Sequence, residues 1–370
     1  MVWFSLLCCF GWAQAQPGCT DPLATNYNAG ATYNNGTCTY AVGSYSLTTV
    51  AFLPATLNEI SGMAYYNGKL YGHKDSGGPA EVYEIDSTTG AITKTIILAG
   101  ASNVDWEDIT QDATHFYVCD CGNNANGNRT NLQVYKFPKS SIGAGSTVTI
   151  PAADIQTINF SYADQTDFTP QGANNTRFDC EALAYNRGKL HLFTKNWVGT
   201  HSVHYVLPII AGIYSAARKD SINTGAVKIT GAAFGAYNEL ILIGYEVTGL
   251  ANCALFLDFG FDGSYYYFNT GCRRKLDIGP AVLYGQLEGI CFVNALHGFA
   301  SSEFFSIPFP PITVGQTLYN FNVYNYIKAY YQHNQLSLTN IAPVAGMLRY
   351  NSDTKKTEGY DGSHWDILNN

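Results

Sequence analysis

The chain has 370 residues, a formal net charge of −8 and only 13% charged side chains. The acidic balance offers no basic surface for nucleic acid, and the body of the chain has no run of about 18 apolar residues that predicts a membrane span. The 36 glycines and 27 tyrosines favour many short strands joined by tight turns. We therefore expect an all-β protein.

Residues 1–16, MVWFSLLCCFGWAQAQ, have the features of a secretory signal peptide. An apolar core is followed by Ala13-Gln14-Ala15, which matches the A-x-A pattern of a cleavage site. A buried N-terminal strand is the alternative interpretation of the same residues. The signal peptide predicts a secreted protein that acts in the extracellular space or at the cell surface.

Export also changes how the cysteines are interpreted, because an oxidising compartment favours disulfides over thiolate metal sites. Two of the ten cysteines leave with the signal peptide, and the remaining number is even. We expect the bridges Cys19–Cys38 and Cys253–Cys272, since each closes a short segment rich in glycine and asparagine.

Residues 17–43 form a turn-rich segment, in which GCTDPLATNYNAGATYNNGTCTY is bounded by cysteines. It resembles the short GCTDP modules that recur in secreted proteins of Bacteroidetes-type bacteria. A segment of this size cannot hold a hydrophobic core of its own, so a Cys19–Cys38 bridge is expected to hold it together.

Residues 44–330 contain a repeat, which is the strongest signal in the chain. Each copy has a polar first residue, a short apolar strand, a turn and a second alternating strand. The copies begin at Glu59, Glu107, Glu181, Thr230 and Glu288. A spacing of about 50 residues is typical of a four-stranded β-propeller blade. Five blades fit the count, and six require a further copy within the longer second step. Residues 45–53, YSLTTVAFL, are expected to close the ring as the outer strand of the last blade.

The second copy, NVDWEDITQDATHFYVCDCGNNANGNR, resembles the DWEDIA…DiGDN…R signature of a group of uncharacterised secreted β-propellers from Bacteroidetes-type bacteria. EISGMAYYNGKLYGHKDSG and the later copies resemble the other blades of that group in order. The resemblance covers residues 57–305 and implies the fold and export more strongly than an activity. This chain has Cys121 in place of an aliphatic residue and Asn123 in place of the usual aspartate, so a metal role at position 123 is not implied.

In a propeller the first strand of each blade lines the central channel, and the second strand runs back beside it. The starts of the first strands and the ends of the second strands therefore share one mouth of the channel. The first strands begin at the five residues named above, and the second strands end at Asp75, Asp120, Lys195, Tyr245 and Glu303. We predict a ligand-binding site at this mouth, with Glu59, Glu107, Glu181 and Glu288 as candidate metal ligands. Its predicted residues are Glu59, Asp75, Glu107, Asp120, Arg129, Glu181, Lys195, Glu288 and Glu303.

Carboxylates gathered at close range raise one another's pKa or recruit a cation. Calcium is the cofactor that such a set suggests, because it takes six to eight oxygen ligands, whereas no set of histidines and cysteines has the spacing of a zinc site. Two other interpretations remain open. The carboxylates accept hydrogen bonds from the adjoining blade, or they take part in catalysis.

The segment CDCGNNANGNR, residues 119–129, is predicted to end the second strand of the second blade. Side chains alternate along a strand, so Asp120 points away from its two cysteine neighbours toward the rim. Cys121 is then expected to bridge to Cys180 on the adjacent inner strand, and Arg129 to pair with a carboxylate of the rim.

Residues 331–370 end in MLRYNSDTKKTEGYDGSHWDILNN, which resembles the C-terminal segments of fibre-like and cell-surface proteins. The pattern predicts a β-hairpin with a polar turn. Attachment to a surface is the role that the resemblance implies, and a small hairpin packed on the propeller is the alternative.

Two functions follow from these features. The first is a secreted or cell-surface binding propeller that takes an extracellular ligand, either a glycan, a small molecule or a surface protein, at its acidic channel mouth. The second is a Ca²⁺-dependent hydrolase of phosphoesters or related esters. The flanking segments favour the binding protein, and the carboxylates favour the hydrolase, although the sequence shows no evident pair of nucleophile and base.

Overall fold

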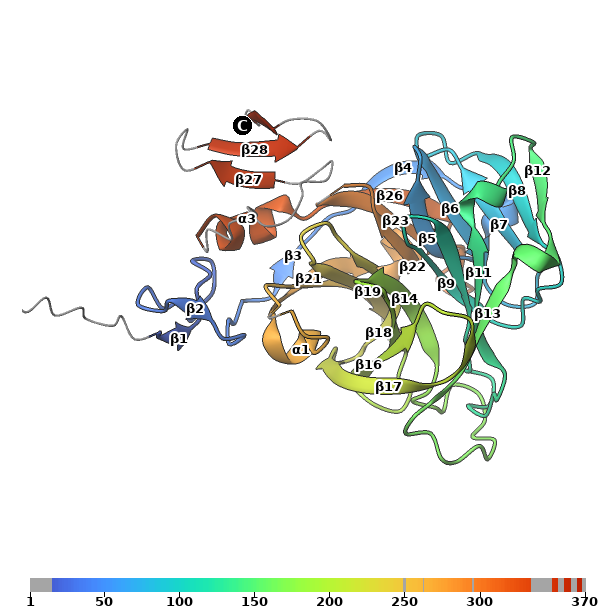
Figure 1. The fold of residues 1–370 in the computed structure, drawn as a ribbon, viewed down its shortest axis with the longest axis horizontal. Helices are drawn as coiled ribbons and strands as arrows, with labels where there is room; N and C mark the ends of the chain where they lie inside the picture. Colours follow the sequence, from blue (N-terminus) through green and yellow to red (C-terminus); the bar gives the residue numbers. More distant parts are fainter. Residues whose placement is uncertain are drawn as a thin grey trace, which may run out of the picture.

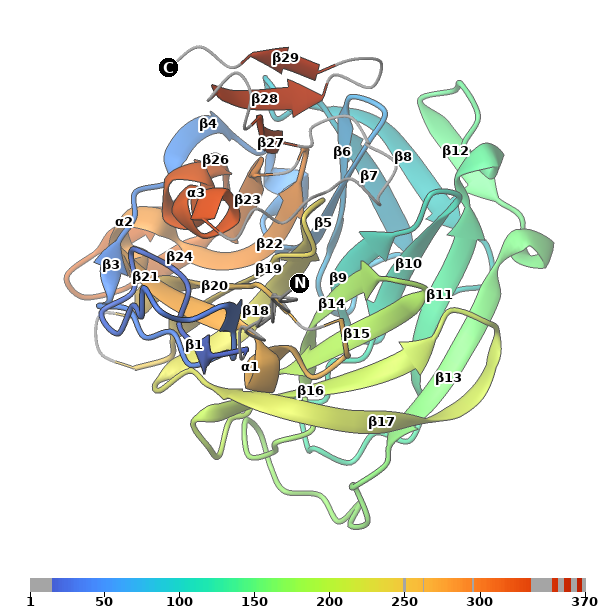
Figure 2. The same cartoon turned by 60° about the vertical axis from the view of Figure 1, so that its left-hand side comes forward.

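The computed structural model describes residues 15–248, 251–261, 263–294, 296–333, 348–351, 356–360 and 365–367. Strands dominate these residues, and the sheets are arranged around a common centre (Figures 1 and 2). The protein is an all-β propeller, as the sequence predicts. The predicted signal peptide falls almost entirely on residues 1–14, which lie outside the described residues.

Each blade is built on four antiparallel strands, to which some sheets add further strands. Blade 1 consists of β5 (Ile60–Tyr66), β6 (Lys69–Lys74), β7 (Glu81–Ile85) and β8 (Ile92–Leu98). Blade 2 consists of β9 (Trp106–Gln111), β10 (His115–Asp120), β11 (Leu132–Pro138) and β13 (Gln156–Tyr162). Blade 3 consists of β14 (Cys180–Asn186), β15 (Lys189–Thr194), β16 (His201–Pro208) and β17 (Gly212–Asn223). Blade 4 consists of β18 (Val227–Phe234), β19 (Leu240–Glu246), β20 (Asn252–Phe259) and β21 (Cys272–Pro280). Blade 5 consists of β22 (Gln286–Phe292), β23 (His297–Glu303), β26 (Thr317–Asn322) and β4 (Thr48–Phe52).

The ring closes by joining the two ends of the propeller within one sheet. Strand β4 comes from the N-terminal side and pairs antiparallel with β26, with Ala51 opposite Leu318. The prediction that residues 45–53 supply the outer strand of the last blade is confirmed. The inner strands β5, β9, β14, β18 and β22 each contact the next, and β22 contacts β5. The described part of the chain has these five inner strands, and the number of blades stays a prediction.

Shorter elements lie in the N-terminal segment and in the connections between strands. They are β1 (Pro17–Gly18), β2 (Tyr33–Asn34), β3 (Gly43–Ser44), β12 (Thr147–Ile150), β24 (Phe305–Ile307), β25 (Ile312–Val314), α1 (Tyr267–Thr270), α2 (Ala281–Tyr284), α3 (Tyr324–His333) and the 3₁₀ turns Ala55–Leu57, Lys139–Ser141 and Ala152–Asp154. Strand β12 pairs parallel with β8, and β13 pairs parallel with β17, which joins blades 2 and 3 into one sheet. Within the described part of the chain, no helix is long and apolar enough to cross a lipid bilayer.

Tight turns set the register of the inner hairpins. Asn67 and Gly68 connect β5 to β6 with φ values of 49° and 81°, and Arg187 and Gly188 connect β14 to β15 with 49° and 78°. Two successive residues with positive φ match the turn that suits a two-residue β-hairpin. In both hairpins the turn glycine is followed by Lys-Leu, so the second strand starts at the same place in blades 1 and 3.

The hydrophobic core is divided among the interfaces between adjacent blades. Trp106, Phe116 and Phe137 lie between blades 1 and 2, for example, and each is fully buried. Similar clusters fill the other four interfaces, including the one between blades 5 and 1. Burial of one such aromatic or aliphatic side chain contributes roughly 1.5–3 kcal/mol, so the ring is held by every interface at once.

The inner strands are edge strands, and their free backbone groups face the channel. Side chains from neighbouring blades satisfy several of these groups. The Asp108 carboxylate accepts the Leu183 N–H at 2.7 Å and the Ile109 N–H at 2.8 Å, and the N–H groups of Met63 and Ala232 also donate to it. Asp108 is fully buried, and its hydrogen bonds connect the inner strands of four blades.

The N-terminal segment is held together by a disulfide between Cys19 and Cys38, as predicted. It contacts blade 4 through an ion pair of 3.3 Å between Asp21 and Arg274. The Arg274 guanidinium also lies 4.0 Å from the centre of the Tyr40 ring. These contacts attach the segment to the propeller.

The prediction of a Cys253–Cys272 disulfide is wrong, because both cysteines are free and buried. Strands β20 and β21 pair antiparallel, with Cys253 opposite Gly279 and Cys272 opposite Phe259. The two cysteines therefore lie at opposite ends of the strand pair. The glycine-rich segment between them forms a long connection rather than a short loop closed by a bridge.

After α3, the described part of the C-terminal segment is a small antiparallel sheet of β27 (Leu348–Asn351), β28 (Lys356–Tyr360) and β29 (Trp365–Ile367) (Figure 2). The first two strands are the predicted hairpin. The third strand, which begins at Trp365, adds to the same sheet. Attachment as the role of this sheet stays a prediction.

We predict that Asp108→Ala lowers the free energy of unfolding by about 2–4 kcal/mol, because several buried N–H groups lose their acceptor. Urea unfolding measures the change. Asp277→Ala serves as a control, since the Asp277 side chain is 52% exposed. A loss for Asp108→Ala no larger than that of the control would contradict the assigned role.

We predict that replacing both Cys19 and Cys38 with serine makes residues 17–43 sensitive to protease, because this segment buries few apolar side chains. A bridge over a loop of this length contributes about 3 kcal/mol in the chain-entropy account. Limited proteolysis with mass spectrometry locates the cuts, and thermal unfolding reports on the propeller. Equal protease resistance of the variant and the unmodified protein would show that the bridge is not needed.

Candidate functional site

A β-bulge lies near the start of every inner strand. In each blade the pairing between the first two strands skips one or two residues. The skipped residues are Ser61 and Gly62, Glu107, Glu181, Thr230, and Glu288 and Gly289. A bulge bends the strand and redirects a side chain. The bulges thus place equivalent side chains of the five blades at one mouth of the channel.

Seven carboxyl groups and one lysine gather at this mouth, which we call the acidic mouth. Its members are Asp75, Asp105, Glu107, Asp179, Glu181, Glu288, Glu303 and Lys195. One oxygen from each of Asp75, Asp105 and Glu107 lies within 4.8 Å of the others, and the same holds for Glu107, Asp179 and Glu181. The two triads share Glu107.

Most of the residues predicted from the repeat meet here. Glu107, Glu181 and Glu288 are 3–5% exposed, and they come from three inner strands. Asp75 and Glu303 are partly exposed and follow or end the second strands of blades 1 and 5. The structure therefore brings together carboxylates from four blades. Whether they bind a ligand stays a prediction.

Glu59 does not join the acidic mouth. Its side chain is 53% exposed and lies 3.5 Å from the Lys74 ammonium group. The bulge in blade 1 falls on Ser61, so Ser61 is the equivalent of Glu107, and Glu59 lies two residues earlier. The Ser61 hydroxyl donates a hydrogen bond of 2.5 Å to the Glu107 carbonyl oxygen and ties blade 1 to blade 2.

Asp120 is fully buried beside the acidic mouth, not at its rim. Its carboxylate accepts hydrogen bonds from the Arg129 guanidinium at 2.8 Å, the Asp105 N–H at 3.1 Å and the Gln133 amide at 3.1 Å. Arg129 pairs with a carboxylate, as predicted, but that carboxylate is buried and not part of the rim. Because its oxygens are occupied, Asp120 holds the backbone of Asp105 in place.

Thr230 and Tyr245 also lie where the repeat predicts, but they bind neighbouring protein groups. The Thr230 hydroxyl donates to the Leu287 carbonyl oxygen at 2.5 Å. The Tyr245 hydroxyl donates to Glu288 Oε1 at 3.1 Å and accepts from the Gln286 amide at 2.6 Å. Thr230 supports the interpretation that blade-initial residues link adjacent blades.

Asp105 and Asp179 were not predicted from the sequence. Each lies two residues before a bulged glutamate, in Asp105-Trp106-Glu107 and Asp179-Cys180-Glu181. Residues two apart on a strand share a face, so the repeated D-x-E pattern is a signal that would have found both. Blade 1 has Glu59 at the equivalent position, and its longer side chain extends into solvent.

Burial and mutual repulsion make the carboxyl groups difficult to ionise. Burial, with smaller effects of Glu181 and Asp105, raises the pKa of Asp75 to about 7. Burial and Glu181 raise the pKa of Asp105 to about 6. Burial raises the pKa of Glu288 to about 8 against the opposing charge of Lys195.

The pKa values of Glu107, Asp179 and Glu303 lie well above their usual values. Burial is the main cause for each, and neighbouring carboxylates add to it. In the described part of the chain, no donor makes a hydrogen bond to the Glu107 carboxylate. Glu107 is therefore a buried acid whose negative charge has no local compensation.

Lys195 is the one lysine of the acidic mouth. Its ammonium group lies 2.9 Å from Glu181 Oε2. Burial alone would lower the pKa of Lys195, but Glu181 and the other acidic groups raise it well above the usual value. One positive charge offsets only part of the charge that seven carboxylates carry when they ionise.

The loop after β10 is built around Gly122 and Asn123. A Cβ atom on Gly122 would overlap carboxylate oxygens of Glu107 and Asp105, so only glycine allows this close approach. The Asn123 N–H donates to Asp179 Oδ1 at 2.5 Å, and the Asn123 Oδ1 accepts the Arg129 N–H at 2.9 Å. Asn123 therefore organises the loop and positions Asp179.

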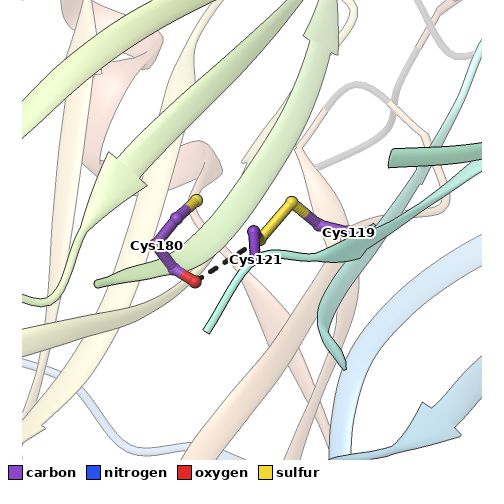
Figure 3. A group of neighbouring side chains, drawn as sticks. All are labelled: Cys119, Cys121 and Cys180. Atoms are coloured by element: carbon purple, nitrogen blue, oxygen red, sulfur yellow. Dashed lines mark hydrogen bonds between the residues drawn. A yellow bond between two sulfur atoms is a disulfide. The ribbon is translucent and has the colours of Figure 1, made fainter. Parts of the chain in front are cut away.

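The prediction of a Cys121–Cys180 disulfide is wrong. Cys119 and Cys121 are bonded to each other, and Cys180 is a buried free thiol (Figure 3). The Cα atoms of Cys119 and Cys121 are 5.3 Å apart. Cys119 and Cys121 are two residues apart, so the alternation of side chains along the strand places both sulfurs on the same side. Cys121 Sγ lies 3.5 Å from the Cys180 carbonyl oxygen.

The donor set of the acidic mouth suits a hard divalent cation. The two triads provide carboxylate oxygens only, and calcium and magnesium prefer such ligands. The three neighbouring cysteines form a separate sulfur group, and two of their sulfurs are already bonded. The residues present fit calcium better than zinc.

No protein-family model and no curated protein matches this chain. Among solved structures, an exo-β-1,3-galactanase from Phanerochaete chrysosporium has 11% identity and a TM-score of 0.43, covering 90% of this chain and 70% of that one. A PQQ-bound aldose sugar dehydrogenase from Streptomyces coelicolor has 10% identity and a TM-score of 0.41, covering 76% and 100%. A calcium-binding regucalcin from Agrobacterium tumefaciens has 11% identity and a TM-score of 0.37, covering 74% and 94%. Similarity at this level carries no functional inference.

We predict that the ion-free protein becomes less stable as the pH rises from about 4 to about 8. Because these pKa values are raised, the folded state holds protons that the unfolded state has already released. The free energy of unfolding therefore falls as the pH rises from the usual carboxyl pKa to the value of about 8 for Glu288. Glu288→Gln removes one of these groups. Its stability relative to the unmodified protein should therefore increase across the same interval.

Urea unfolding in chelator at a series of pH values measures this difference. Glu59→Gln is the matched control, because Glu59 lies outside the acidic mouth. A pH dependence no larger for Glu288→Gln than for the control would contradict the raised pKa of Glu288.

Proposed function

We propose that this protein is a secreted or cell-surface binding propeller whose acidic mouth takes up calcium as part of its ligand site. The observation that carries the proposal is the buried, uncompensated carboxylate of Glu107, which lies within two carboxylate triads. A buried carboxylate with no hydrogen-bond donor is costly to ionise unless a cation or a proton joins it. A divalent cation removes that cost.

The partly exposed members of the acidic mouth give the site its outer side. Asp75, Asp105 and Glu303 are accessible to solvent, whereas Glu107, Asp179 and Glu181 are buried. An ion that enters past Asp75 and Asp105 meets buried ligands next. An extracellular ligand with hydroxyl or carbonyl oxygens, such as a glycan, would complete the coordination of that ion.

The flanking segments support an extracellular location. Disulfides such as Cys19–Cys38 and Cys119–Cys121 are typical of oxidising compartments. The sheet of β27, β28 and β29 extends the chain beyond the propeller. We propose that this sheet attaches the protein to a surface and leaves the acidic mouth available for ligand.

A Ca²⁺-dependent hydrolase of phosphoesters or related esters is the second candidate. One observation favours it: Asp75 is partly exposed at the acidic mouth, and its pKa of about 7 suits a general base. The single lysine argues against strong binding of an anionic phosphoester. Release of 4-nitrophenol from a phosphodiester and from an acetate ester, with calcium and with chelator, tests for activity. Asp75→Asn should abolish a true activity.

We predict that calcium raises the melting temperature of the unmodified protein at pH 8 and that Glu107→Gln removes most of this rise. At about a hundredfold excess over Kd, one ion adds roughly 2.7 kcal/mol to stability. In chelator, Glu107→Gln should be at least as stable as the unmodified protein, because the variant relieves repulsion between buried carboxylates.

Scanning calorimetry gives the melting temperatures of the unmodified protein and of Glu107→Gln, each with calcium and with chelator. Glu59→Gln is the matched control. The control should keep the full calcium effect. Coincident curves for the unmodified protein with and without calcium would refute the calcium proposal and leave the carboxylates with a structural role.

A further inference from the structure

We propose that the acidic mouth is a two-ion centre, in which the Glu107 carboxylate bridges two divalent cations. This inference rests on the proposed function, because it requires that the mouth binds calcium at all. Site A consists of Asp75, Asp105 and Glu107, and site B consists of Glu107, Asp179 and Glu181. The two sites have only Glu107 in common.

Glu107 has the properties of a bridging ligand. Its side chain is 3% exposed, and it belongs to both triads within the same 4.8 Å limit. A carboxylate has two oxygens and can offer one to each ion, and paired ions in proteins lie about 3.5–4 Å apart. Gly122 has no side chain, so its backbone packs directly against the carboxylates of Glu107 and Asp105 and holds them side by side.

Site B is preformed by the surrounding protein. The Asp179 carboxylate accepts the Asn123 N–H at 2.5 Å on one oxygen and the Trp197 indole N–H at 2.7 Å on the other. These two bonds fix its orientation and leave further lone pairs on both oxygens. Lys195 lies 2.9 Å from Glu181 and already supplies one positive charge to this site.

Site A has no ion pair of its own, although the charges of Arg129 and Lys195 also act on Asp105. Among the described residues, no lysine or arginine forms an ion pair with Asp75, Asp105 or Glu107. Repulsion between ionised carboxylates is therefore least relieved at site A, and the first ion should bind there. The second ion must compete with Lys195 for Glu181, so site B should be the weaker site.

The charge of the acidic mouth favours two ions over one. A single divalent cation leaves most of the seven carboxyl groups without compensation, and Glu288 and Glu303 then add to the field around site B. Two cations together with Lys195 balance most of the negative charge. Calcium fits both sites, since each offers oxygen ligands and leaves positions for water or ligand oxygens.

Calorimetric titration of the full chain with calcium chloride at pH 8 tests the two-ion centre. We expect two ions per chain for the unmodified protein, with unequal affinities. Asp105→Asn should remove the tighter site and leave one ion, and Asp179→Asn should remove the weaker site and leave one ion. Glu107→Gln should weaken both sites at least tenfold. Glu59→Gln should leave both unchanged.

Terbium luminescence gives a second measurement that a purely structural role would not change. Trp197 donates its N–H to Asp179 and therefore lies beside site B, where it can sensitise a Tb³⁺ ion. Trp106 lies between the site A ligands Asp105 and Glu107 in the chain, so an ion at either site can be sensitised. Emission on excitation of tryptophan should therefore rise over two equivalents of Tb³⁺, and Asp179→Asn should lose only the second increment. Circular dichroism confirms that each variant is folded.

The possible ion counts separate this inference from the proposed function. Two ions with the stated pattern of variants support the two-ion centre. One ion, weakened alike by all three variants of the acidic mouth, overturns the two-ion centre but keeps the calcium-binding function. No bound ion overturns both.

Discussion

The inner edge of each blade imposes the constraint on which the rest of this structure depends. Five edge strands face the channel, and each has backbone N–H and C=O groups that no further strand can pair. Buried groups of this kind need partners. Asp108 supplies an acceptor for several N–H groups at once, and the hydroxyls of Ser61 and Thr230 donate to carbonyl oxygens of the next blade. Polar residues on the inner strands are therefore required for the fold itself.

The acidic mouth goes beyond this structural need. A residue that only links blades, such as Asp108 or Thr230, has its polar atoms occupied by backbone groups of the neighbouring strand. Glu107 occupies the same bulge position as Thr230 but has no such partner on its side chain. At equivalent positions, side chains that are hydrogen-bonded to a neighbouring strand maintain the propeller. Side chains without such a bond, such as Glu107, are available to a ligand.

The fold was largely predictable because it is repeated. A short apolar strand, a turn and an alternating strand recur with a similar spacing, and the N-terminal strand β4 closes the ring where the pattern placed it. The disulfides were less predictable, since pairing depends on which strand ends meet in space. Cys121 and Cys180 do approach each other, but Cys119 is nearer in the chain and takes the bond.

The site was predicted in its location but not in its register. Aligning the repeats by their first acidic residue made Glu59 the equivalent of Glu107. The bulges show that Ser61 is the equivalent residue. A bulge adds a residue without changing the apolar pattern, so the sequence alone does not locate it. Asp105 and Asp179 precede β9 and β14, and the prediction started each of these blades at the following glutamate, so both aspartates were left out.

The central claim is that a cation, and not a proton, compensates the buried charge of Glu107. An anomalous difference map from crystals grown with calcium and soaked with manganese at pH 8 tests it most directly. The account predicts a peak in contact with the Glu107 carboxylate, flanked by Asp105 or Asp179. A map without any peak in the acidic mouth, in crystals where these carboxylates are ordered, would contradict it.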